Sequence, residues 1–142
     1  MTSVDEQKDL LGHVLVPVAN PKDAERTATQ LKPYNPEEVT VVHVVEKGDG
    51  APDKTPVEHS KSVAREAYST FKMAFPDANT HTDYGRDVVE TITNVASDVD
   101  ATAIVFSSRG GNRIVQFLAG DRTLKLVTEA GRPVIALPLV EE

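Results

Sequence analysis

Short apolar runs alternate along the chain with helix-type segments, and this alternation is the strongest constraint on its fold. The apolar, mostly β-branched runs lie at 13–18, 39–45, 102–106 and 133–137, and a weaker polar run lies at 79–84. Near-continuous apolar strands are typical of parallel sheets that are covered on both faces. The order β-α-β-α-β-α-β-α-β therefore predicts an α/β domain built on a parallel sheet.

Four helices are expected between these strands, from their caps and from the spacing of their apolar residues. Asn20 is a good N-cap, and Pro21 is tolerated in the first turn of the helix that follows. Asp121 suits the N-cap of the last helix, and Gly131 suits the C′ position after it. The helices are predicted from Pro21 to the prolines at 33 and 36, over about 57–74, over 88–99 and over 121–130.

The crossover between two parallel strands is right-handed, which leaves few topologies for such a chain. We predict a doubly wound open sheet of five parallel strands in the order 3-2-1-4-5, with two helices on each face. The polar residues 1–12 are expected to form a flexible acidic tail, and residues 13–142 a single domain. Residues 107–112 are rich in Ser and Gly and are expected to form a loop, followed by an apolar turn that begins at Ile114.

Composition and charge exclude several classes of protein. The 142 residues include no cysteine, which excludes disulfides, iron–sulfur clusters, thiolate zinc sites and a cysteine nucleophile. With 22 acidic and 15 basic residues the formal net charge is −7, which disfavours nonspecific binding to nucleic acid. No apolar run approaches the ~20 residues of a membrane span, and the polar N-terminus does not resemble a signal peptide, so a cytoplasmic location is expected. The acidic surface serves either solubility or adaptation to a salty cytoplasm.

Catalytic and metal sites are not indicated by the polar residues. His13, His43 and His81 lie on three predicted strands, and no histidine pair has the i, i+4 spacing of a helical metal site, so all four are interpreted as structural. No G-x-S-x-G pattern surrounds Ser107, and the residues after the first strand lack the acidic cluster of a phosphoryl-accepting receiver domain. We therefore predict that the protein is not an enzyme.

Four segments together resemble the universal stress protein A family over about residues 11–140. They are His13 to Val18, Val42 to Glu46, Ile104 to Gly110 and Gly131 to Leu137. The resemblance implies a Rossmann-like fold of the adenine nucleotide alpha hydrolase type, with a nucleotide cleft beyond the carboxyl ends of the strands. It places these residues at that cleft: Pro17, Ala19, Val42, Ser107, Arg109, Gly110, Gly120 and Asp121.

The ATP-binding branch of that family carries Gly-x-x-Gly, nine further residues and then Gly-Ser or Gly-Thr, with an Asp two residues after the first strand's Pro. Gly110 and Gly120 match this pattern, with nine residues between them. Ser107 stands at the first Gly, Asp121 at the hydroxyl position and Ala19 at the Asp. The motif is therefore degenerate at three positions.

The three changes predict weak ATP binding or none. Ala19 removes an acceptor for the nucleoside, and Ser107 adds a side chain where backbone approaches a phosphate. Asp121 caps its helix with a carboxylate, which competes with phosphate for the same N–H groups and repels it. Arg109 strengthens ATP binding if its side chain contacts a phosphate. Otherwise it is paired with carboxylates or solvated.

Two functions remain open at this stage. The first is a non-enzymatic regulatory or stress-response protein without a cofactor. The second is a switch that binds ATP or AMP through the loop from Ser107 to Gly120. In either case we predict a homodimer through the last strand, Pro133 to Val140. Long apolar edge strands are usually covered or paired. The resemblance implies the same pairing. The alternative is a monomer whose edge is blunted by Pro133 and Pro138.

Overall fold

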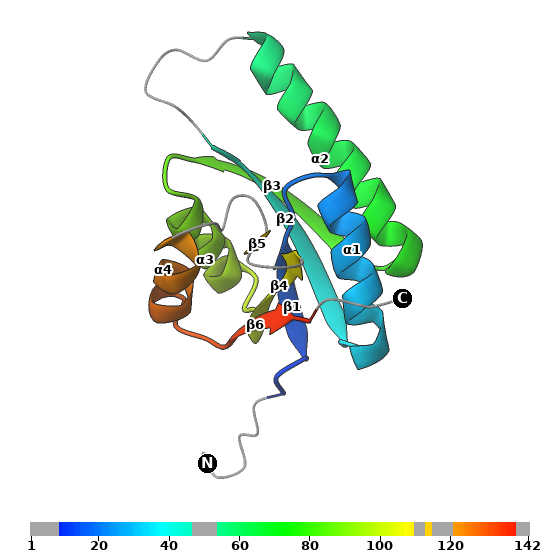
Figure 1. Cartoon of the computed structure of the whole chain (residues 1–142), viewed down its shortest axis with the longest axis vertical. Coiled ribbons are helices and arrows are strands. Elements are labelled where there is room, and N and C mark those ends of the chain that lie inside the picture. The colour runs from blue at the N-terminus through cyan, green and yellow to red at the C-terminus, as the bar shows by residue number, and fades with distance from the viewer. Residues whose placement is uncertain (1–8, 47–53, 110–112, 115–120, 139–142) are drawn as a thin grey trace.

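The computed structural model describes residues 9–46, 54–109, 113–114 and 121–138 (Figure 1). Five strands form a parallel sheet in the spatial order β3-β2-β1-β4-β6, and a short β5 pairs antiparallel with the end of β4. The predicted order 3-2-1-4-5 is thus confirmed, with β6 as the fifth parallel strand. The strands are β1 (His13–Pro17), β2 (Glu38–Glu46), β3 (Asn79–Gly85), β4 (Ala103–Arg109), β5 (Arg113–Ile114) and β6 (Val134–Leu137).

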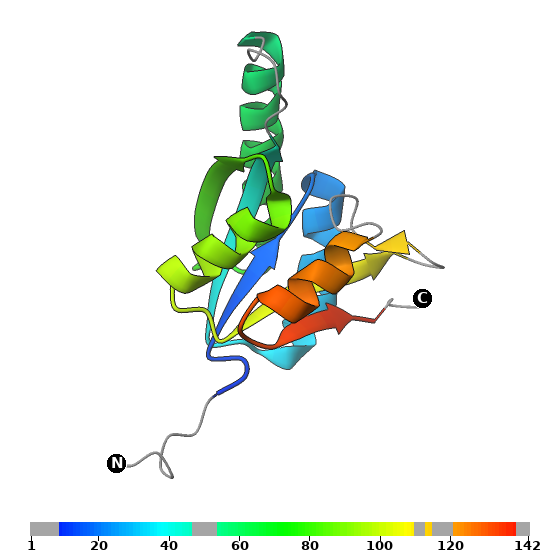
Figure 2. The ribbon, with the colours of Figure 1, turned by 90° about the vertical axis from the view of Figure 1, so that its left-hand side faces the viewer.

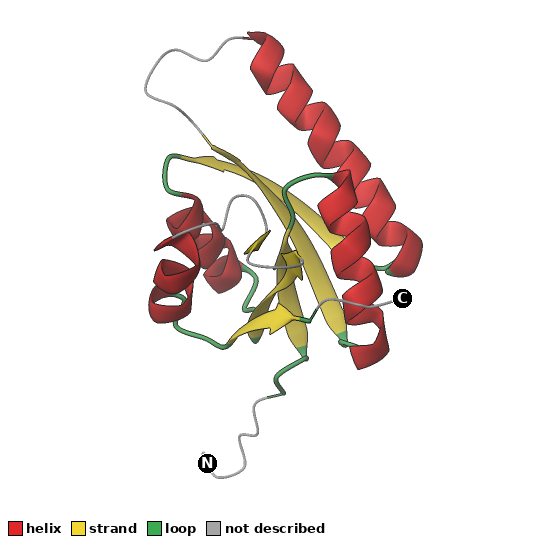
Figure 3. Cartoon of the chain, viewed as in Figure 1, coloured by secondary structure: helices red, strands yellow, loops and turns green. Residues whose placement is uncertain are grey.

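Two helices cover each face of this sheet, as predicted (Figure 3). Helices α1 and α2 pack against each other on one face, whereas α3 and α4 lie together on the other, which faces the viewer in Figure 2. The bounds are α1 (Pro21–Leu31), α2 (Lys54–Ala74), α3 (Val88–Asp98) and α4 (Asp121–Glu129), and a 3-10 turn, η2 (Lys32–Tyr34), follows α1.

Two apolar cores, one on each face, hold the layers together. Alternate residues of a strand point to opposite faces, so Val14 and Val16 enter the first core and Leu15 enters the second. The first core contains Ala24, Ala28 and Leu31 of α1 with Ala67 and Phe71 of α2. The second contains Val88, Ile92 and Val95 of α3 with Leu126 of α4.

Strand β4 is longer than the sequence predicted. The prediction ended it at Phe106 and began a loop at Ser107, but β4 runs to Arg109. Its last residues pair with β5, Ser108 opposite Ile114 and Arg109 opposite Arg113. Ile114, where an apolar turn was expected, is therefore part of an antiparallel pair. The remainder of that predicted turn lies outside the described residues.

The segment before β1 is attached to the domain. The carbonyl of Leu11 accepts a hydrogen bond from the Glu37 N–H at 2.9 Å, and the carbonyl of Gly12 accepts one from the Glu38 N–H at 3.1 Å. The Thr102 hydroxyl donates to the carbonyl of Leu10 at 3.0 Å. These residues, assigned to a flexible tail from the sequence, are thus bonded to the body, and residues 1–8 lie outside the described part. In the described chain, no helix has the length and apolarity needed to span a membrane.

Candidate functional site

The carboxyl ends of β1, β2 and β4 bring several predicted site residues together. Pro17 ends β1 and stands opposite Val42 of β2 in the ladder. The Val18 N–H donates to the carbonyl of Val42 at 2.9 Å, so the chain that leaves β1 stays beside β2 for one more residue before it turns into α1. Ser107, on the neighbouring strand β4, is fully buried. The strand order reverses between β1 and β4. The carboxyl ends of these two strands, called here the switch-point edge, are therefore the place at which α/β sheets bind ligands.

Three other predicted site residues belong to the same end of the sheet. Ala19 lies in the turn between β1 and α1, Arg109 is the last residue of β4, and Asp121 begins α4. Gly110 and Gly120 lie outside the described residues.

The start of α1 carries two side-chain caps. The Asn20 side-chain oxygen accepts a hydrogen bond from the Asp23 N–H at 2.8 Å, so Asn20 is the N-cap that the sequence predicted. The Asp23 Oδ2 atom accepts from the Ala19 N–H at 2.9 Å. A helix N-terminus leaves N–H groups that an anionic ligand can use. In α1, side chains of the same segment already accept hydrogen bonds there.

Asp23 also joins α1 to β4. Its side chain is buried, with the residue 1% exposed. The Asp23 Oδ1 atom lies 3.5 Å from the Ser107 hydroxyl oxygen and 3.8 Å from Nη1 of Arg26. Sequence reasoning missed Asp23, because by residue type alone it is an ordinary acidic residue of a first helical turn. The available signal was its position one helical turn after Ala19, where the family pattern has lost a carboxylate.

His43 has a structural role at the same edge. It is 8% exposed, and its Nδ1–H donates to the carbonyl of Val18 at 3.0 Å, which fixes the turn after β1 onto β2. His13 contacts the Thr40 hydroxyl through Nε2 at 2.8 Å. Among the residues that the structure describes, no group of three or more His, Asp or Glu side chains is arranged to hold a metal ion.

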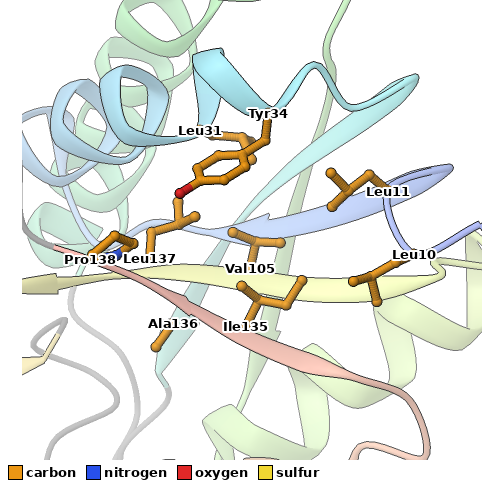
Figure 4. Close-up of a pocket in the computed structure, with 9 residues that line it drawn as sticks. All are labelled: Leu10, Leu11, Leu31, Tyr34, Val105, Ile135, Ala136, Leu137 and Pro138. Atoms are coloured by element: carbon orange, nitrogen blue, oxygen red, sulfur yellow. The ribbon is translucent and has the colours of Figure 1, made fainter.

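A second feature is an apolar pocket beside β6, with a volume of about 310 Å³ (Figure 4). Tyr34 of η2 lies over it, and Leu10 and Leu11 close its far end. Val105 of β4 and Ile135 of β6 form the floor. The pocket lies on the sheet face that α1 covers, at the side where that cover ends. The contribution from Leu10, Leu11 and Tyr34 was not predicted, because these residues come close to β6 only in the folded chain.

Comparisons with solved structures agree with this fold. A universal stress protein from Archaeoglobus fulgidus, solved in complex with dAMP, has a TM-score of 0.65 at 22% identity, over 87% of this chain and 95% of its own. UspA from Lactobacillus plantarum has a TM-score of 0.63 at 22% identity, over 89% and 97%. A universal stress protein in complex with cAMP has a TM-score of 0.60 at 16% identity, over 90% and 97%. At these identities the likeness shows a shared fold. None of the curated protein sequences matches this chain.

The family assignment rests on the sequence as a whole. The model of the universal stress protein family matches residues 11–138, which include every described strand and helix. The resemblance seen in four separate segments is thereby confirmed, and this chain belongs to the universal stress protein family.

Proposed function

We propose that this protein is a non-enzymatic regulatory member of its family that acts as a homodimer and binds ATP weakly or not at all. The proposal rests on the contacts made at the carboxyl ends of β1 and β4. The Ala19 N–H donates to Asp23, and Ser107 is buried next to the same carboxylate. The Ala19 N–H and the Ser107 hydroxyl, which could otherwise contact a nucleotide, thus contact a side chain of the same protein. The cytoplasmic location expected from the sequence stays a prediction.

Weak ATP binding follows from three substitutions in the family pattern. Ala19, Ser107 and Asp121 stand where ATP-binding members carry Asp, Gly and a hydroxyl residue. A lost hydrogen bond to a charged group is worth about 1.5–3 kcal/mol. Two such losses, together with repulsion from Asp121, shift a micromolar site to about millimolar or weaker, at ~1.4 kcal/mol per tenfold.

Calorimetric titration with Mg-ATP tests this part of the proposal. We expect no binding in the micromolar range for the natural sequence. The double variant Ala19→Asp with Asp121→Ser, which restores two family residues, should bind more tightly. Micromolar binding by the unaltered protein would contradict the proposal, and an unchanged double variant would show that these two positions do not limit affinity.

The homodimer is supported by the geometry of β6. The Ile104 N–H of β4 donates to the carbonyl of Pro133, so residues 133, 135 and 137 present their backbone groups to β4. In a strand the intervening residues face the other way, so Val134 and Ala136 present theirs to the open edge. An antiparallel copy related by a two-fold axis would set Val134 of one chain opposite Ala136 of the other. The apolar pocket beside this edge supports the same arrangement, because a partner would cover it.

Light scattering at micromolar concentration tests the dimer. The chain mass is 15.4 kDa, so a dimer has twice that mass, or 30.8 kDa. Ala136→Pro removes an outward N–H without touching the ladder to β4, and should shift the protein toward the monomer. Ala136→Ser is the matched control, since it keeps the N–H. A monomeric natural sequence, or a dimeric Ala136→Pro variant, would contradict pairing through β6.

A nucleotide-dependent switch is the second candidate function. It is favoured by two structurally similar family members that were solved with dAMP and with cAMP. In this chain it would use the segment from Ser107 to Gly120, with Arg109 as the phosphate partner. The Mg-ATP titration, repeated with AMP, distinguishes the two candidates, because only the switch requires micromolar affinity.

A further inference from the structure

The buried carboxylate of Asp23 has a role that goes beyond capping a helix. Groups from three places in the fold surround it: the N–H of Ala19 in the β1–α1 turn, the hydroxyl of Ser107 on β4 and the guanidinium of Arg26 on α1. Their distances to the carboxylate oxygens are 2.9 Å, 3.5 Å and 3.8 Å. All three groups can donate hydrogen bonds, and two of them come from segments that form the switch-point edge.

These donors are of the kind that binds anionic ligands. Backbone N–H groups at a helix start, hydroxyls and arginine side chains are the usual partners of phosphate oxygens in proteins. Nη1 of Arg26 is buried and has no hydrogen-bond partner in the described structure, its ion-pair contact being Asp23 at 3.8 Å. The arrangement therefore resembles an anion site whose anion is supplied by the chain itself.

We propose that Asp23 is a specificity-determining residue that occupies, from within the chain, the anion position at the carboxyl ends of β1 and β4. The inference rests on the proposed weak binding of ATP and adds a cause to it that the family pattern does not contain. Because Asp23 is 1% exposed, water screens its negative charge little, and that charge opposes the approach of a phosphate. Such an arrangement discriminates against nucleoside phosphates and other polyanions.

The variant Asp23→Asn tests this role, because it removes the charge while keeping an oxygen that can accept from the Ala19 N–H. Titration calorimetry with Mg-ATP and with inorganic pyrophosphate should show at least tenfold tighter binding than the natural sequence. Glu25→Gln is the matched control, since it removes one charge from an exposed position of the same helix. Its affinity for both probes should stay within about twofold of the natural sequence, as expected for a screened surface charge.

The outcomes separate this inference from the proposed function. Micromolar binding of Mg-ATP by the natural sequence would overturn both. Weak binding by the natural sequence and an equally weak Asp23→Asn variant would overturn the inference alone. A gain of the same size in Glu25→Gln would attribute the effect to overall charge, and weaker binding by Asp23→Asn would make Asp23 a ligand contact. Either result also overturns the inference.

A second variant protects the experiment from a failure to fold. Asp23→Ser keeps an oxygen that can accept a hydrogen bond in the first turn of α1, and it removes the charge. The far-ultraviolet circular dichroism spectrum and the thermal unfolding midpoint of each variant are compared with those of the natural sequence. Binding is then measured on each variant that retains the native spectrum, with the same expected gain of at least tenfold.

Discussion

Arg132 shows how a single side chain stabilises the place where three segments meet. Its Nη1 donates to the carbonyls of Ala96 and Ala101 at 2.9 and 2.8 Å, and its Nε donates to the carbonyl of Ala130 at 3.2 Å. Ala96 and Ala101 are buried, so these carbonyls have little access to water as an alternative partner. The end of α3 and the start of β4 are thus fixed to the segment that precedes β6.

Replacing Arg132 should therefore destabilise the fold. We expect Arg132→Ala to lower the free energy of unfolding by about 2–3 kcal/mol, because buried carbonyls lose a charged donor. Arg132→Lys should recover only part of the loss, since an ammonium group does not offer the same fork of donors. Urea denaturation measures both. Arg65→Ala, at an exposed position of α2, serves as the control and should change stability by less than about 0.5 kcal/mol.

Gly85 is required by the packing of the turn between β3 and α3. A Cβ atom placed there would collide with the hydroxyl oxygen of Thr91, which donates to the carbonyl of Asp87 at 2.8 Å. Overpacking of this kind is worth about 1–3 kcal/mol, so Gly85→Ala should destabilise the protein by that amount. The double variant Gly85→Ala with Thr91→Ala should be less destabilised than the sum of the two single variants. Additive effects in a double-mutant cycle would show that the two positions are not in contact.

The candidate site illustrates which residues a sequence can reveal. Pro17, Val42 and Ser107 could be assigned to one end of the sheet because segments around them resemble those of a known family. Asp23 could not, because its role depends on the angle at which α1 leaves the edge and on the neighbouring strand β4. Contacts between residues 84 positions apart, such as Ser107 with Asp23, are set by the fold and have no local pattern.

At the scale of elements, the α3–α4 face is joined by an ion pair that starts at a helix cap. Asp87 is the N-cap of α3 and accepts from the Glu90 N–H at 3.1 Å, and Lys125 of α4 contacts its other oxygen at 2.5 Å. The hydrogen bond from Lys125, then that from the Glu90 N–H, lower the pKa of the Asp87 carboxyl below its usual value. One carboxylate thus serves both helices.

The lowered pKa of Asp87 predicts how acid affects stability. A carboxyl group whose pKa is lower in the folded state stabilises the fold above its unfolded-state pKa, near 3.9, and that contribution is lost as the pH falls through the lower folded value. Asp87→Asn keeps a good N-cap but carries no charge, so its stability should depend less on pH below about 4. Unfolding by urea from pH 7 to pH 2 measures the difference. Identical pH profiles for the variant and the natural sequence would contradict the assignment.

Elements were predictable to different degrees for physical reasons. Strands β1, β2 and β6 and all four helices follow from apolar spacing and caps, since burial on a covered sheet leaves a clear pattern. The extension of β4 to Arg109 was missed because polar residues such as Ser107 and Ser108 have no strand pattern. Their strand conformation depends on pairing with β5 and β6, and pairing is a property of the partner strand.

At the scale of the whole molecule, the cover of the sheet is uneven. Helices α1 and α2 leave the β6 side of their face partly open, which is where the apolar pocket lies (Figure 4). At the opposite edge, β3 is polar, with no buried residue between Asn79 and Gly85. One edge is thus suited to water and the other is apolar, which is why the dimer that we propose pairs through β6 and not through β3.

The net charge of −7 belongs to the molecule as a whole and not to any one site. Repulsion among acidic groups opposes folding, and salt reduces it, since the screening length falls from about 10 Å at 0.1 M to about 3 Å at 1 M. If the surface is adapted to salt, the thermal unfolding midpoint should rise from low to molar KCl.

The triple variant Glu25→Gln, Glu66→Gln and Asp98→Asn changes exposed positions and brings the charge from −7 to −4, because three negative charges are removed. Its gain with KCl should be smaller than that of the natural sequence, because general effects of salt on apolar surface are common to both proteins. No gain in the natural sequence, or an equal gain in both, would leave solubility as the reason for the acidic surface.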